Sequence, residues 1–109
     1  MRRGEIWIAA GGADFAGKPR PVVIIQDDRF AETNSITVCA FTSNSTEAPL
    51  FRLAIAPTEG TGLEKTSRLM VDKITTIPKA KLGARIGRLS PEDMVRLNRA
   101  ILTFLGLAG

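Results

Sequence analysis

Short apolar runs separated by turn-forming residues fill residues 1–70, and this spacing restricts the fold more than any other feature. Strand-like runs occur at 5–9, 22–25, 36–41 and 50–56, with Gly, Pro, Ser, Thr, Asn or Asp between them. Parallel strands need a crossover of about a dozen residues or more, usually a helix, and the spacing leaves no room for one. The pattern therefore predicts antiparallel strands in a small barrel or strongly curved sheet.

The later sequence continues in the same way and then ends in a helix. We expect a strand from Arg68, with residues 74–77 continuing it or starting the next, then a short helical turn over 78–82 and a last strand over 84–89. The fold class is thus mainly β with one C-terminal helix.

The C-terminal helix has clear start and stop signals. Ser90 is a good N-cap, Pro91 suits the first helical position, and Asp93 completes an S-x-x-D capping box. Gly106 should end the helix. Its broad apolar face should pack on the sheet, and the remainder could serve a dimer contact; the face comprises Met94, Val95, Leu97, Ile101, Leu102, Phe104 and Leu105.

Composition predicts one folded domain in a reducing compartment. The 109 residues suffice for a single core, and 44% hydrophobic with 24% charged residues is ordinary for a soluble protein. No apolar run approaches the roughly 20 residues of a membrane helix, and strand-like sequence follows Met1 without a signal-peptide core. The lone Cys39 excludes an internal disulfide, indicates the cytoplasm and suits a core position. Without His, a Cys/His zinc site is excluded, and we expect neither a metal nor another cofactor.

Positive charge is concentrated in residues 65–88, which carry seven basic side chains, including Arg68, against Asp72 alone. Residues 1–64 carry six basic and eight acidic side chains, so the overall excess of +4 lies in the later segment. Such a segment attracts a polyanion, either RNA or an acidic protein tail.

The strongest candidate site is Arg20, set between Pro19 and Pro21 at the entrance of the 22–25 strand. The prolines hold the chain extended, so the guanidinium has a defined position. If the 22–25 and 36–41 runs pair across their short connection, they are antiparallel, and the start of one lies beside the end of the other. Thr42 and Ser43 would then lie near Arg20, which is the outline of a phosphate site.

The glycine-rich segment 10–17 lies directly before Arg20 and is expected to act as a flap over it. It lacks G-x-G-x-x-G and G-K-[ST], so it is not a nucleotide loop. Phe15 and Phe30, in polar loops, are candidates for stacking on bases. Asp14, Asp27 and Asp28 are candidate general bases, and the sequence does not choose among them.

Four segments resemble the MazF/PemK family of ribonuclease toxins, in the family's order. They are Arg3-Gly4-Glu5-Ile6-Trp7, Arg20-Pro21-Val22-Val23-Ile24, Phe41-Thr42-Ser43 and the 67–77 strand ending Ile74-Thr75-Thr76-Ile77. The resemblance implies an SH3-like barrel with a C-terminal helix, a homodimer, and a metal-independent endoribonuclease acting on single-stranded RNA. It also implies an antitoxin whose acidic, flexible tail covers the RNA groove.

Carried over by position, the resemblance assigns the catalytic roles to Arg20 and Thr42. We expect RNA contacts from Lys18, Ser43, Asp14, Phe15, Asp27 and Arg68. The flap departs from the family's acidic-Gln-Gly pattern, because Asp14-Phe15-Ala16-Gly17 stands there. In the expected reaction the RNA 2′-hydroxyl attacks the adjacent phosphorus, leaving a 2′,3′-cyclic phosphate and a 5′-hydroxyl end, while Arg20 opposes the growing charge.

Two other functions fit the same sequence. A non-enzymatic toxin on this scaffold could bind a protein target such as DNA gyrase, in which case Arg20→Ala would leave toxicity intact and the terminal helix would carry it. A plain RNA-binding barrel would bind RNA without cutting it.

Overall fold

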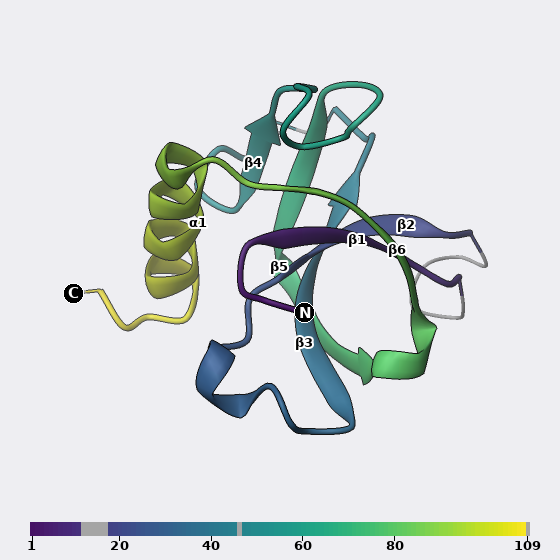
Figure 1. Cartoon of the computed structure of the whole chain (residues 1–109). Helices are drawn as coiled ribbons and strands as arrows, with labels where there is room; N and C mark the ends of the chain where they lie inside the picture. Colours follow the sequence, from purple (N-terminus) through teal and green to yellow (C-terminus); the bar gives the residue numbers. More distant parts are fainter. Residues whose placement is uncertain (12–17, 46, 109) are drawn as a thin grey trace.

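The computed structural model describes residues 1–11, 18–45 and 47–108, which form one antiparallel sheet and a C-terminal helix (Figure 1). The six strands lie in the order β4-β5-β3-β2-β1-β6. Their bounds are β1 Glu5–Ala9, β2 Arg20–Ile24, β3 Ser35–Thr42, β4 Arg52–Ile55, β5 Ser67–Pro78 and β6 Leu82–Arg88, and the helix is α1 Pro91–Phe104. The expected curved antiparallel sheet with a terminal helix is confirmed.

Among the described residues, two short 3-10 turns join strands. The turn η2 (Asp28–Phe30) lies between β2 and β3, and η3 (Lys79–Lys81) lies between β5 and β6, where a helical turn was expected. All strand pairs are antiparallel, including β2 with β3, in which Val22 faces Ala40. The pairing on which the Arg20 site depends is therefore confirmed.

The strand β5 is continuous but changes register partway along. Its second half pairs with the start of β3 through Cys39 and Ile74, whereas its first half places Leu69 opposite Phe41. Residues 70–73 of β5 therefore lie opposite a single residue of β3. Extra residues on one strand of a pair bend that strand and increase its twist. The first half of β5 also pairs with β4, so the bend turns that edge of the sheet.

Alternating side chains on the strands supply two apolar clusters. Val23 and Cys39 belong to the cluster that receives Leu97 and Ala100 from α1, whereas Val22 and its neighbours belong to a second cluster on the other side of the sheet. Successive residues of a strand point to opposite faces, so a sheet covered on both faces needs apolar residues at consecutive positions. The run 22–25 satisfies that requirement.

The terminal helix begins as the sequence predicted. Ser90 Oγ accepts a hydrogen bond from the Asp93 backbone N–H at 3.1 Å, and Gly106 follows the helix with a φ of +74°. The capping box would pair the Asp93 carboxylate with the Ser90 backbone N–H. In the structure this carboxylate accepts a hydrogen bond from Arg96 Nη1 at 2.8 Å. Within the described residues, no helix has the length and apolar character needed to cross a membrane.

The loop between β4 and β5 is fixed against β6 by a close backbone contact. The Arg88 backbone N–H donates to the Gly60 carbonyl at 2.9 Å. A Cβ atom on Gly87 would lie 2.4 Å from the Gly60 carbonyl oxygen, and a Cβ on Gly62, whose φ is +70°, would lie 2.1 Å from the Ile86 oxygen. Only glycine permits backbones to approach this closely. The contact joins two segments that are far apart in the sequence.

Candidate functional site

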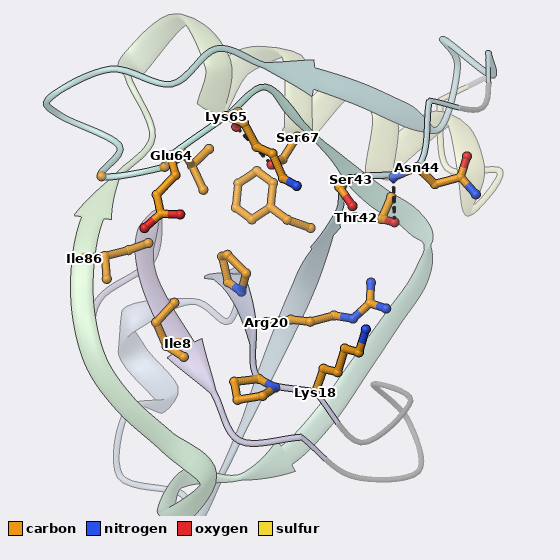
Figure 2. A pocket seen from close by; sticks show the side chains of 15 residues that line it. Ile8, Lys18, Arg20, Thr42, Ser43, Asn44, Glu64, Lys65, Ser67 and Ile86 are labelled. Carbon is orange, nitrogen blue, oxygen red and sulfur yellow. Dashed lines mark hydrogen bonds between the residues drawn. The ribbon is translucent and has the colours of Figure 1, made fainter.

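A pocket of about 850 Å³ lies where β1, β2 and β6 meet the end of β3 and the loop 62–67 (Figure 2). Its lining includes apolar side chains, among them Ile8, Phe41 and Ile86, and a set of polar and charged groups. A pocket of this size with a largely apolar wall and a few converging polar groups is typical of a ligand site.

Arg20 and Thr42 lie together at this pocket. The β2–β3 register pairs Val22 with Ala40, and continued by two residues it sets Arg20 opposite Thr42. Both side chains are half-buried and line the pocket. Within the part of the chain that the structure describes, the Arg20 guanidinium has no hydrogen bond or ion pair. Its five N–H donors are thus available to an anion.

The Thr42 hydroxyl is held by the turn that follows β3. The Asn44 backbone N–H donates to Thr42 Oγ1 at 3.2 Å. An oxygen that accepts a backbone bond still carries its own proton and can donate it to a ligand oxygen. Ser43, which also lines the pocket, is exposed and adds a second hydroxyl.

The pocket has an uneven distribution of charge. Lys18, Arg20 and Lys65 contribute cations, and Lys18 lies beside Arg20 at one side (Figure 2). Glu64 is the one acidic residue among the described residues that line the pocket; it lies across from Lys18 and Arg20, near Ile8 and Ile86, on the same side as Lys65. The cationic side suits a phosphate, because two cations and a hydroxyl converge there.

Other residues named from the sequence lie elsewhere. Asp27 is beyond the far end of β2, where its carboxylate accepts bonds from the Arg29 side chain and backbone; these bonds lower its pKa. Asp28 Oδ1 accepts from the Arg3 backbone N–H at 2.7 Å. Neither aspartate lines the pocket. The structure does not bring them together with Arg20.

Arg68 lies next to the site without lining it. It is opposite Thr42 in the β3–β5 register, and its guanidinium forms a 3.5 Å ion pair with the exposed Glu47. Asp14 and Phe15, with the proposed flap, lie outside the described residues. The Phe30 ring is exposed and carries the Arg29 guanidinium at 5.7 Å from its centroid, away from the pocket.

Cys39 is a core residue, as expected. It is fully buried, and burial, followed by the charge of Asp72, raises the pKa of its thiol to about 12. A thiol with that pKa remains protonated at neutral pH and does not act as a nucleophile.

Sequence reasoning missed the wall formed by Glu64, Lys65 and Ile86. These residues reach the pocket because the loop carrying Glu64 and Lys65 is fixed to β6 through Gly62 and Gly87. The glycines at 60 and 62 indicate a turn, but no local pattern indicates which strand the turn contacts.

Comparison with known proteins places the chain in a family. A family profile described as PemK-like, MazF-like toxin of type II toxin-antitoxin system matches residues 2–105. A probable endoribonuclease MazF from Mycolicibacterium smegmatis is 57% identical over 109 residues, covering 100% of both chains. Endoribonuclease MazF9 from Mycobacterium tuberculosis is 32% identical over 117 residues, covering 98% of each.

Solved structures share the fold. An endoribonuclease from a Mycobacterial species, solved in complex with its cognate antitoxin, superposes with a TM-score of 0.83 at 24% identity and covers 100% of this chain and 98% of its own. The Mycobacterium tuberculosis toxin MazF-mt6 superposes with a TM-score of 0.81 at 25% identity, over 96% and 99% of the two chains. The chain therefore belongs to the PemK-like, MazF-like family of toxins of type II toxin–antitoxin systems.

Proposed function

We propose that this toxin is an endoribonuclease that cleaves single-stranded RNA without a metal, with Arg20 and Thr42 at the scissile phosphate. One observation carries the proposal: an Arg guanidinium with no partner among the described residues lies beside a threonine hydroxyl at the cationic side of a pocket. The relatives named endoribonuclease support the same reaction class.

The reaction uses a nucleophile that the RNA supplies. The 2′-oxygen attacks the neighbouring phosphorus as the bond to the 5′-oxygen breaks, giving a 2′,3′-cyclic phosphate and a 5′-hydroxyl end. The 2′-hydroxyl loses a proton and the departing 5′-oxygen gains one. Arg20 donates two parallel hydrogen bonds to the non-bridging oxygens, whose negative charge grows in the transition state.

Thr42 acts by position rather than by charge. Its hydroxyl, held by the Asn44 backbone N–H, donates to a phosphate oxygen or to the 2′-oxygen and keeps the attack in line. Lys18, beside Arg20, neutralises a neighbouring phosphate, and Ser43 adds a further donor. Arg68, opposite Thr42 in the β3–β5 register, adds a further cation next to the site. Asp14 and Phe15 stay predictions from the sequence, and Asp27 lies too far along β2 to join this set.

We also propose that the toxin is a homodimer neutralised by an antitoxin. Support for an additional protein contact comes from the exposed apolar side chains on and after α1, which include Leu102, Phe104, Leu105 and Leu107. The Mycobacterial relative solved with its cognate antitoxin supports an antitoxin partner. An acidic, flexible antitoxin tail would be attracted to the cations around the pocket.

The test is incubation of pure protein with mixed single-stranded RNA in EDTA, followed by analysis of the RNA ends. Cyclic-phosphate and 5′-hydroxyl ends from the wild type, lost with Arg20→Ala and Thr42→Ala at unchanged folding, are the expected result. Intact RNA from sequence-diverse substrates would overturn the proposal. Growth arrest that survives Arg20→Ala would then favour a protein target, and binding without scission would identify an RNA-binding barrel.

A further inference from the structure

The side of the pocket opposite Arg20 has the features of a base-binding subsite. Ile8 on β1 and Ile86 on β6 provide apolar surface there, and the Glu64 carboxylate lies beside them (Figure 2). Proteins read single-stranded RNA by packing unstacked bases on side chains and hydrogen-bonding their exposed edges. A nucleotide whose phosphate lies at Arg20 would extend its base toward this wall.

The wall is held in place before any ligand arrives. Leu63 is buried in the core immediately before Glu64, and Ser67 Oγ donates to the Lys65 carbonyl at 3.1 Å. The buried Thr61 Oγ1 accepts from the Thr58 backbone N–H at 3.0 Å. Together with the close contact of Gly62 with β6, these bonds fix the backbone that carries Glu64. Because the backbone is already fixed, only the exposed Glu64 side chain has to be ordered on binding.

The carboxylate selects for one base edge. An ionised carboxylate accepts hydrogen bonds through two oxygens and donates none, so its best partner presents two adjacent donors. Guanine does so with N1–H and the N2 amino group. Adenine and cytosine each place an amino donor beside a ring-nitrogen acceptor, and uracil places its single N3–H between two carbonyl acceptors. With these three bases, one carboxylate oxygen would face another acceptor.

We infer that Glu64 binds the Watson–Crick edge of a guanine in the RNA and makes guanine the preferred base at this subsite. The inference rests on the proposed function, because it assumes that the pocket binds RNA. Within the described residues, Glu64 has no ion pair or hydrogen bond that would occupy its carboxylate. A bidentate contact of this kind discriminates against the wrong base by roughly 5- to 150-fold.

Binding measurements test the inference independently of cleavage. The ligands are seven-nucleotide 2′-deoxyuridine strands with guanine, adenine, cytosine or uracil at the middle position, which lack the 2′-hydroxyl and cannot be cut. We expect the wild type to bind the guanine strand about tenfold tighter than the other three. Glu64→Gln should bind all four within about threefold, because a carboxamide has one donor and one acceptor and every base offers a matching pair.

Two controls separate base reading from charge and from catalysis. Glu59→Gln removes the same charge from the same loop at an exposed position that does not line the pocket, and it should keep the guanine preference. On RNA, Glu64→Gln should lose its preference for guanine-containing sites and cut additional sites, whereas Glu59→Gln should keep the cleavage pattern of the wild type.

The possible failures are distinguishable. Equal binding of the four strands by the wild type overturns the inference, as does a preference that survives Glu64→Gln. A uniform loss of cleavage in Glu64→Gln with its base preference intact also overturns it and makes Glu64 a proton acceptor. Guanine-selective binding without cleavage of RNA would overturn the proposed function and leave the inference standing.

Discussion

Arg52 and Asp72 form a two-point ion pair between β4 and the bend in β5. Arg52 Nε donates to Asp72 Oδ1 at 2.7 Å, and Nη2 donates to Oδ2 at 2.9 Å. The two side chains are only 14% and 20% exposed. Residues 70–73 lack regular partners on β3. The ion pair therefore adds a side-chain contact to the backbone bond from the Val71 N–H to the Phe51 carbonyl, at 3.0 Å, and both hold the bend beside β4.

Replacing Asp72 with Asn should lower the free energy of unfolding by about 2 to 3 kcal/mol at pH 7. The Arg52 hydrogen bonds lower the pKa of Asp72, so its stabilising contribution is complete above the unfolded pKa of about 3.9 and is lost as the pH falls through the folded pKa. Urea unfolding of the wild type and Asp72→Asn should therefore give a difference in the free energy of unfolding that is constant from pH 7 to about pH 4. Between about pH 4 and pH 3 this difference should shrink. A difference independent of pH would contradict this role.

Replacing Gly62 with Ala should destabilise the protein by about 2 kcal/mol or more. The φ of +70° disfavours any side chain, and the new Cβ would lie 2.1 Å from the Ile86 carbonyl oxygen. Gly60→Ala is the matched control, because a Cβ there meets only Thr58 Oγ1 at 3.8 Å. Thermal unfolding should show a clear loss for Gly62→Ala and a change within about 0.5 kcal/mol for the control.

Replacing Arg20 with Lys should lower kcat for RNA cleavage by about 100-fold, with a much smaller change in KM. Lysine keeps the charge but cannot donate two parallel hydrogen bonds to one phosphate. Arg88→Lys, on an exposed part of β6 that does not line the pocket, should cleave as the wild type does. An Arg20→Lys rate within threefold of the wild type would mean that Arg20 contributes only its charge.

Native protein should not react with maleimide at pH 7.5 through Cys39. The thiol is buried, so the reagent cannot reach it, and burial raises its pKa to about 12, so it is not a thiolate at this pH. The unfolded chain should take up one equivalent, since Cys39 is its single cysteine. A Ser45→Cys variant, exposed in the fold, should label rapidly in the native state and shows that the reagent is active.

Local sequence patterns predicted most of the elements of the fold. Ser90 and Gly106 bounded the helix because caps depend on neighbouring residues, and the runs at 22–25 and 36–41 gave the antiparallel pair that joins Arg20 to Thr42. Asp27 was predicted at the site because it follows the same strand as Arg20. Arg20 lies at the start of β2, however, and Asp27 lies beyond its end, so the length of the strand separates them.

The rest depended on contacts between distant segments. Whether residues 74–77 continue the strand from Arg68 could not be decided, because the bend is set by the pairing of Arg52 with Asp72. The Glu64 wall is placed by glycine contacts between the 57–66 loop and β6, and spacing along the chain does not encode them.

The pairing of β1 with β6 has a consequence for how the toxin is made. Glu5 of β1 faces Arg88 of β6, so the first strand can pair with one of its two neighbours only once β6 has been made. Sheets dominated by such distant pairings fold slowly. Because Ile86 of β6 lines the pocket together with residues of β1 and β2, the proposed RNA site is incomplete in a nascent chain that does not yet include β6. The pocket of the toxin can therefore form only after β6 has been synthesised.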